Sequence, residues 1–251
     1  MGEGSGIGWT QNTWNPWQCC RKKSPGCKNC YMFRDKKRYG KDPNIVVRSS
    51  FKTFNNPKSW KTPSLVFVCS WSDFWIEEAD EWREEAFAIM RNTPHIYQIP
   101  TKRPERIASH LPRDWGDGYP NVMLMVSVES QAFLNRAEML AEIPCQGGRG
   151  ISYEPALGPV DFSSVLFWYD WLISGGESGY GKPGDEFYPR PAELDWFRSA
   201  RDQCERFDVP YFHKQNGGTK RINGKAGGNL LDWMTYENYP ASFARVMKAE
   251  A

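Results

Sequence analysis

Short apolar runs alternate with longer amphipathic segments along most of the chain. Runs typical of β-strands occur at residues 7–10, 65–70, 96–101, 122–128, 150–153, 171–174 and 210–214. Between them, apolar residues that recur every three or four positions predict helices over 76–91, 130–143 and 192–207. The strand at 65–70 begins Leu65-Val66-Phe67-Val68 and is apolar on both faces, which is typical of a parallel sheet covered by helices.

Repeated strand–helix units predict an α/β fold, and we expect a partial or full (β/α) TIM-like barrel with parallel strands. A doubly wound open sheet is the alternative that periodicity leaves open. Asn223-Gly224 lies within a Gly-rich extension over 217–251 and predicts a tight type I′ hairpin, which would form a small C-terminal flap. With no internal repeat or linker, we expect a single domain over 1–251 that carries a cysteine loop at 13–31.

Polar residues follow most of the predicted strands. In parallel α/β folds the active site lies at the carboxyl ends of the strands, so these residues are expected to meet at one rim. Polar residues also end strands where no site exists, so the set carries more weight than any member. The candidates for cofactor contacts are Ser70, Asp73, Lys102, Ser127, Glu129, Gly175, Gly176 and Glu177.

Composition excludes several classes of protein. The chain has 251 residues, of which 40% are hydrophobic and 25% charged, as in ordinary globular proteins. No apolar run approaches the ~20 residues that span a bilayer, and the N-terminus does not have the pattern of a signal peptide. We therefore expect no membrane partner and a cytoplasmic location. Seven cysteines without an export signal favour metal or redox use over disulfides.

Positive charge is concentrated near the N-terminus. Residues 1–61 hold thirteen Lys and Arg but three acids, so this segment carries +10 and the remainder −8. Aromatic residues are interleaved with the cations over 31–60. Basic surfaces with stacking rings suit nucleic acid, so a nucleic acid or nucleotide is the expected partner. A solvated helix face with core aromatics is the alternative.

Three cysteines lie within eleven residues. Cys20, Cys27 and Cys30 follow the pattern C-x6-C-x2-C, and Pro25-Gly26 provides a turn between them. Thiolates are soft ligands that favour iron–sulfur clusters or zinc. Three thiolates would leave one iron of a four-iron cluster open, whereas a structural zinc ion requires four ligands. Cys69, at a strand end, is a more plausible fourth ligand than Cys19, because adjacent cysteines rarely bind one ion.

Sequence motifs along nearly the whole chain resemble the phage-associated three-cysteine-motif family. They are Thr13-Trp14-Asn15-Pro16, Ser24-Pro25-Gly26-Cys27-Lys28-Asn29-Cys30-Tyr31, Thr101-Lys102-Arg103-Pro104, Val126-Ser127-Val128-Glu129, Glu154-Pro155, Gly175-Gly176-Glu177-Ser178-Gly179 and Arg201-Asp202-Gln203-Cys204. That family is similar to radical S-adenosylmethionine enzymes and, more distantly, to spore photoproduct lyases.

The resemblance implies a [4Fe-4S] cluster on Cys20, Cys27 and Cys30 whose open iron binds S-adenosylmethionine. It implies a 5′-deoxyadenosyl radical, an external electron donor and, for a phage-encoded protein, the host cell cytoplasm. We therefore expect modification or repair of a nucleic acid or nucleotide. The alternatives are a non-catalytic nucleic-acid-binding phage protein stabilised by an iron–sulfur cluster or zinc, and an iron–sulfur redox or sensor protein.

Two features depart from the radical-enzyme pattern. The usual spacing is C-x3-C-x2-C, and here the first gap is six residues. The usual Gly-Gly-Glu motif follows the second strand and binds the methionine amine, whereas Gly175-Gly176-Glu177 follows about the sixth. Ser70 and Asp73, at the end of the second predicted strand, are the alternative for that role.

Overall fold

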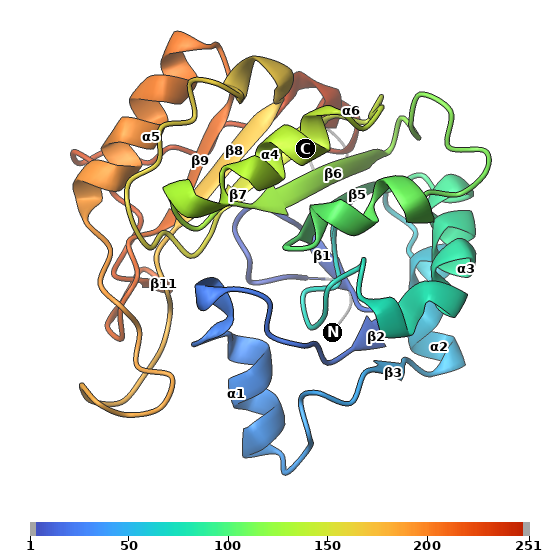
Figure 1. Cartoon of the computed structure of the whole chain (residues 1–251), viewed down its shortest axis with the longest axis horizontal. Helices are drawn as coiled ribbons and strands as arrows, with labels where there is room; N and C mark the ends of the chain where they lie inside the picture. The colour runs from blue at the N-terminus through green and yellow to red at the C-terminus, as the bar shows by residue number, and fades with distance from the viewer. Residues whose placement is uncertain (1–3, 248–251) are drawn as a thin grey trace.

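The computed structural model describes residues 4–247 and shows one curled parallel sheet of seven strands (Figure 1). The strands pair in chain order and are β1 (Asn12–Trp14), β4 (Leu65–Val68), β5 (Ile96–Thr101), β6 (Val122–Ser127), β7 (Arg149–Tyr153), β8 (Trp171–Gly175) and β9 (Tyr211–Gln215). Because each strand pairs with the next along the chain, the winding never reverses. The sheet is thus a half-barrel rather than a doubly wound sheet, and the predicted partial barrel is confirmed.

The predicted helices form with shifted ends. The segment 76–91 gives a 3-10 turn and α3 (Asp80–Arg91), 130–143 gives a 3-10 turn and α4 (Asn135–Ala141), and 192–207 gives α5 (Leu194–Arg206). The remaining helices are α1 (Tyr31–Arg38), α2 (Phe51–Phe54) and α6 (Ala244–Met247). Two short antiparallel pairs join β2 (Trp17–Gln18) to β3 (Val47–Arg48) and β10 (Arg221–Ile222) to β11 (Lys225–Ala226).

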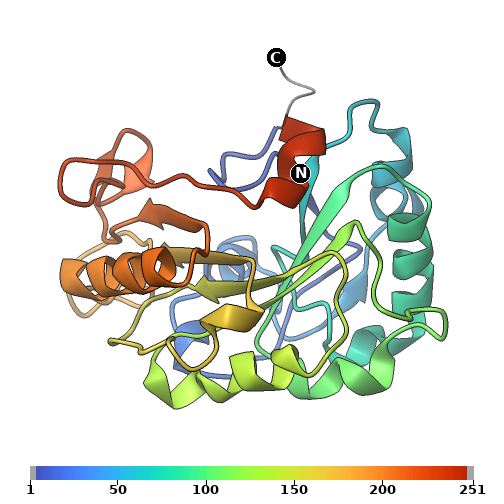
Figure 2. The ribbon, with the colours of Figure 1, turned by 90° about the horizontal axis from the view of Figure 1, so that it is seen from above.

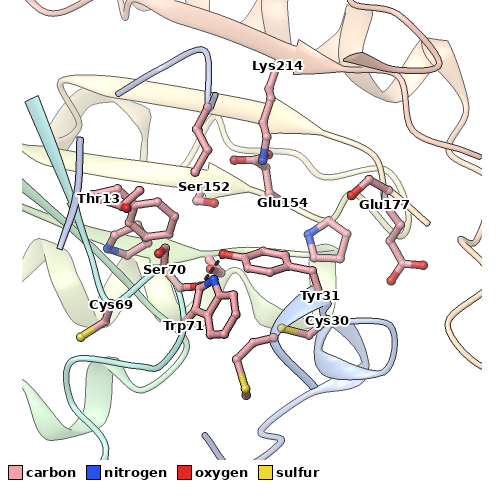
Figure 3. Close-up of a pocket in the computed structure, with 18 of the residues that line it drawn as sticks. Thr13, Cys30, Tyr31, Cys69, Ser70, Trp71, Ser152, Glu154, Glu177 and Lys214 are labelled. Carbon is pink, nitrogen blue, oxygen red and sulfur yellow. Dashed lines mark hydrogen bonds and ion pairs between the residues drawn. The ribbon is translucent and has the colours of Figure 1, made fainter. Parts of the chain in front are cut away.

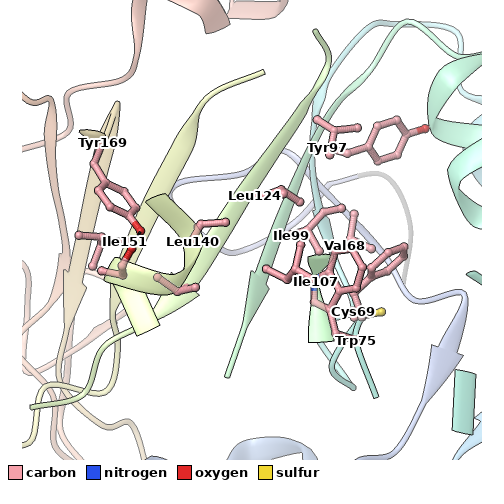
Figure 4. Packing of buried hydrophobic residues seen from close by; sticks show 14 of the residues in the cluster. Val68, Cys69, Trp75, Tyr97, Ile99, Ile107, Leu124, Leu140, Ile151 and Tyr169 are labelled. Carbon is pink, nitrogen blue, oxygen red and sulfur yellow. Dashed lines mark hydrogen bonds between the residues drawn. The ribbon is translucent and has the colours of Figure 1, made fainter. Parts of the chain in front are cut away.

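The main core lies between the sheet and helices α3, α4 and α5 on its outer face (Figures 1 and 2). In Figure 4, Leu140 of α4 lies beside the strands that carry Leu124 and Ile151, and all three side chains are fully buried. The strands can be apolar on both faces because a second buried cluster fills the inside of the half-barrel, as the Leu65–Val68 pattern predicts.

The predicted strand at 7–10 is wrong, since the first strand is β1 at Asn12–Trp14. Trp9 instead fills the inside of the half-barrel, where its ring packs 4.7 Å from that of Phe67 and 6.2 Å from that of Trp171. Its apolar character therefore reflects burial rather than strand pairing.

The predicted hairpin is confirmed. Asn223 and Gly224 both have positive φ, at 50° and 77°, as a type I′ turn between β10 and β11 requires. The predicted domain 1–251 and its extension 217–251 include residues 1–3 and 248–251, which lie outside the described part of the chain.

Candidate active site

A cavity of about 670 Å³ opens at the carboxyl ends of the strands (Figure 3). Parallel register brings the strand ends together, with Ser127 beside Ser152. The three cysteines Cys20, Cys27 and Cys30 line the same cavity. We call residues 20–30, which carry them, the cysteine loop. The strand rim and the cysteine loop therefore face one common space.

Each of the three sulfur atoms accepts a hydrogen bond from an N–H group. The guanidinium of Arg103 donates to Cys20 Sγ at 3.8 Å, and the backbone N–H of Lys23 donates to Cys27 Sγ at 3.4 Å. Cys30 precedes α1, and its sulfur accepts from backbone N–H groups at the start of that helix. Hydrogen bonds to sulfur are a feature of cysteines that hold iron–sulfur clusters. The donors therefore fit three thiolate ligands.

Without a bound cluster, burial disfavours the thiolate forms of Cys20 and Cys30. Burial raises the pKa of Cys20 to about 12, with a further increase from the charge of Asp73 and opposition from Arg103. Burial also raises the pKa of Cys30, against the backbone N–H groups that favour its thiolate. Loading a cluster would therefore release protons from this site.

A zinc ion and a four-iron cluster require different arrangements of the three thiols. Cys20 interacts electrostatically with both Cys27 and Cys30, so the three lie close together. Even so, within residues 4–247 no three His, Cys, Asp or Glu side chains converge on one ion. Zinc needs every ligand about 2.0–2.3 Å from a single ion. A four-iron cluster binds each thiolate at a different iron, so it does not require the three sulfur atoms to meet at one point.

Glu129 anchors the cysteine loop through a hydrogen bond from Ser24. Its buried carboxylate accepts from Ser24 Oγ and, at 3.1 Å, from the guanidinium of Arg136. A Cβ at Gly26 would lie 2.2 Å from Glu129 Oε1, so only glycine fits there. Glu129 does not line the cavity, although we expected it to contact a cofactor.

Glu177 anchors the same loop through a hydrogen bond from Asn29. Its Oε2 accepts from Asn29 Nδ2 and from the backbone N–H of Arg190, each at 2.8 Å. The Arg190 guanidinium pairs with this carboxylate and also donates to Pro25 O at 2.9 Å. Burial acts to raise the pKa of Glu177, but the bonds from Arg190 and Asn29 outweigh it, and the pKa is lowered.

Asp73 is also fully engaged. Its Oδ1 accepts from Thr101 Oγ1 at 2.7 Å and from Trp75 N at 3.0 Å. Its Oδ2 accepts from Lys102 N at 3.1 Å and from Arg103 at 3.0 Å. Asp73 and Glu177 both line the cavity, and each oxygen of both carboxylates already accepts a hydrogen bond from the protein.

Of the other residues predicted to contact a cofactor, all but Gly175 line the cavity. Ser70, Lys102, Ser127 and Gly176 line the cavity. Gly175 does not, and its carbonyl accepts from Ala156 N at 2.9 Å. Cys69 lines the cavity at the end of β4.

Our selection of site residues missed an ion pair inside the cavity. Lys214 Nζ lies 2.8 Å from Glu154 Oε1, and both residues line the cavity near Tyr31 (Figure 3). Glu154 Oε2 accepts no hydrogen bond from the residues that the structure describes. Both residues lie at the ends of predicted strands, and Glu154-Pro155 is one of the motifs named above. The sequence therefore contained a pattern from which both could have been selected. Arg103, in another motif, was missed too.

The basic segment is partly neutralised within the chain. Four of its cations pair with acids from outside residues 1–61, in Arg21–Glu78, Lys23–Glu105, Lys37–Glu186 and Arg48–Glu85. Lys36 is buried against Gln18 and Trp71. Phe33, Phe54 and Trp60 are buried, whereas Tyr39 and Phe51 are exposed. Only part of the segment therefore remains available to a polyanion.

No helix within residues 4–247 is long and apolar enough to cross a membrane.

Comparison with solved structures defines the fold class as that of the spore photoproduct lyases. One such structure, "Spore photoproduct lyase complexed with dinucleoside spore photoproduct", superposes with a TM-score of 0.54 at 12% identity, covering 85% of this chain and 78% of the lyase. A mutant of the lyase gives a TM-score of 0.55 with the same identity and coverage. At this identity the likeness shows the fold alone.

Residues 4–240 match the family described as "Protein of unknown function (DUF5131)", and the chain belongs to that family. Among curated proteins, none matches the chain in sequence.

Proposed function

We propose that this protein is a radical S-adenosylmethionine enzyme that modifies or repairs a nucleic acid or nucleotide. The observation that carries the proposal is the cysteine loop. Three thiols, each with an N–H donor at sulfur, line one cavity at the carboxyl ends of a half-barrel. The lyase-like fold supports it, because spore photoproduct lyases are radical S-adenosylmethionine enzymes. The chain would act as a single domain in the cytoplasm.

Cys20, Cys27 and Cys30 would hold the four-iron cluster. When bound and reduced by an external electron donor, the cluster would supply the electron that cleaves the C5′–S bond of S-adenosylmethionine, giving methionine and a 5′-deoxyadenosyl radical. Glu129 and Glu177 keep the loop in place through Ser24 and Asn29.

S-adenosylmethionine would lie against Ser70, Lys102, Ser127 and Gly176, which line the cavity. Its ammonium group needs an acceptor. We assign that role to Glu154 rather than Asp73 or Glu177, because only Glu154 has an oxygen without a partner among the described residues. Lys214, paired with Glu154, is placed to meet a carboxylate or a phosphate.

The charge of the cavity supports an anionic substrate. Six cations line it against three acids. The cations are Arg34, Lys102, Arg103, Lys214, Arg221 and Lys225, and the acids are Asp73, Glu154 and Glu177. A nucleotide or a nucleic acid strand would provide the complementary charge. The similar lyase structure, which holds a dinucleoside photoproduct, is consistent with such a substrate.

The test is anaerobic reconstitution with iron and sulfide, followed by dithionite and S-adenosylmethionine. The wild-type protein should form 5′-deoxyadenosine, and the Cys27→Ala variant should not. Cys204→Ala is the matched control, because Cys204 is fully buried in the main core away from the loop. Iron binding without cleavage would favour the redox or sensor alternative. Nucleic-acid affinity without iron would favour the non-catalytic one.

A further inference from the structure

Arg103 is tied to a cluster ligand and to a carboxylate at once. It follows β5, and its side chain is largely buried. One guanidinium nitrogen donates to Cys20 Sγ at 3.8 Å and to Asp73 Oδ2 at 3.0 Å. The other donates to Arg21 O at 2.7 Å, within the cysteine loop. The positive charge of Arg103 is therefore fixed against the sulfur of Cys20.

No other described side chain brings a cation into hydrogen-bond contact with one of the three thiols. Cys27 and Cys30 accept from backbone N–H groups, which carry no net charge. The nearby Lys102 is directed to Glu129, with its Nζ 3.6 Å from the carboxylate. At Cys20 the neighbouring charged side chains are therefore Arg103 and Asp73, whereas the charge of Lys102 acts on Cys30.

We propose that Arg103 raises the reduction potential of the four-iron cluster and that Asp73 opposes this effect. The inference rests on the proposed function, because it requires a cluster on Cys20. One-electron reduction adds one negative charge to the cluster. A cation at a ligand sulfur stabilises that charge, and a carboxylate beside the cation opposes it. Hydrogen bonds to sulfur and nearby charge are known determinants of cluster potentials.

Substitutions of Arg103 and Asp73 therefore distinguish a charge effect from structural damage. Removing Arg103 should move the potential down, and removing the charge of Asp73 should move it up. A loosened loop would instead reduce iron content in both variants, and it would give no reason for shifts of opposite sign. Arg103 is accordingly a positioning residue whose role is read from the potential rather than from turnover.

The experiment is a potentiometric titration of the reconstituted protein, followed by electron paramagnetic resonance. At the wild-type midpoint, Arg103→Gln should lower the ratio of reduced to oxidised cluster about tenfold, a shift of about 59 mV for one electron. Arg103→Lys keeps the positive charge but lacks the planar guanidinium that donates from two nitrogens. It should therefore shift the ratio less, in the same direction. Asp73→Asn should raise the ratio.

Arg83→Gln is the matched control. Arg83 is as buried as Arg103, but it donates to Phe74 O and Ile76 O and contacts none of the three loop thiols. Its replacement should leave the potential unchanged.

The outcomes separate the two proposals. A wild-type protein that forms no four-iron cluster would end the proposed function. A cluster that forms in Arg103→Gln and keeps the wild-type potential would overturn this inference alone. A shift of the same sign in the Arg103 and Asp73 variants would overturn it as well. If Arg103→Gln does not load a cluster, the sign of the shift in Arg103→Lys decides.

Discussion

Replacing Gly26 by alanine tests whether Glu129 holds the cysteine loop. The new Cβ would lie 2.2 Å from Glu129 Oε1 and 2.7 Å from its Cδ, well inside contact distance. Glu129 cannot swing away easily, because it is fully buried and its other oxygen accepts from Arg136 at 3.1 Å. The clash should therefore displace the loop and break the bond from Ser24 to Glu129.

Two estimates set the size of the effect. Losing a hydrogen bond to a charged group costs about 1.5–3 kcal/mol. Overpacking a buried site costs about 1–3 kcal/mol. The two share one cause, so we expect about 2–4 kcal/mol against the loop conformation that binds a cluster. Since 1.4 kcal/mol is tenfold, cluster loading at limiting iron should fall at least roughly tenfold.

The assay is iron and sulfide content after anaerobic reconstitution at limiting iron, with urea unfolding of the cluster-free protein alongside. Gly6→Ala is the control, because a Cβ there would meet no atom within 4 Å. It should load iron as the wild type does. Normal loading and unchanged stability in Gly26→Ala would refute the role given to Glu129.

Four further predictions follow from the site. The reconstituted protein should have the brown colour of an iron–sulfur cluster. Cys27→Ala should lose this colour and nearly all iron, measured by absorbance and iron assay, whereas Cys204→Ala should keep both. Glu154→Gln should weaken S-adenosylmethionine binding by roughly 1.5–3 kcal/mol in calorimetry, and unchanged affinity would return the amine role to another group. Because the pKa of Glu177 is lowered from 4.5, its stabilising contribution is complete above that pH and is lost as the pH falls through the lower folded-state value. Melting temperatures of the cluster-free protein should therefore fall more steeply in acid for the wild type than for Glu177→Gln, and parallel curves would contradict this. Single-stranded DNA should bind with log K falling about 0.7 per phosphate contact per decade of salt, and Lys28→Glu should flatten that slope in a fluorescence titration.

The sequence was enough to predict the architecture. Strands such as Ile96–Thr101 and Leu65–Val68 appear where their apolar runs place them, because burial on both faces leaves a continuous signal. Trp9 was misplaced for the same reason, since an apolar residue that fills the barrel looks like part of a strand. The Asn223-Gly224 hairpin was predictable because backbone conformation alone decides it.

The roles of the rim residues were harder to predict. Periodicity places Asp73, Glu129 and Glu177 at strand ends, but it does not say which partner each carboxylate meets. Glu129 turns to Ser24, 105 residues away in sequence, and Glu177 to Asn29, 148 away. Such long-range pairs leave no local pattern. The same limit affects charge, because four of the thirteen cations in the basic segment pair with acids far along the chain.

The central claim is that the cysteine loop supports reductive cleavage of S-adenosylmethionine. The most direct test is to reconstitute the wild-type protein anaerobically, add dithionite and S-adenosylmethionine, and quantify 5′-deoxyadenosine by mass spectrometry. We expect about four irons per chain and 5′-deoxyadenosine that disappears in Cys20→Ala, Cys27→Ala and Cys30→Ala. Stoichiometric zinc in place of iron, or a full four-iron cluster that forms no 5′-deoxyadenosine, would contradict it.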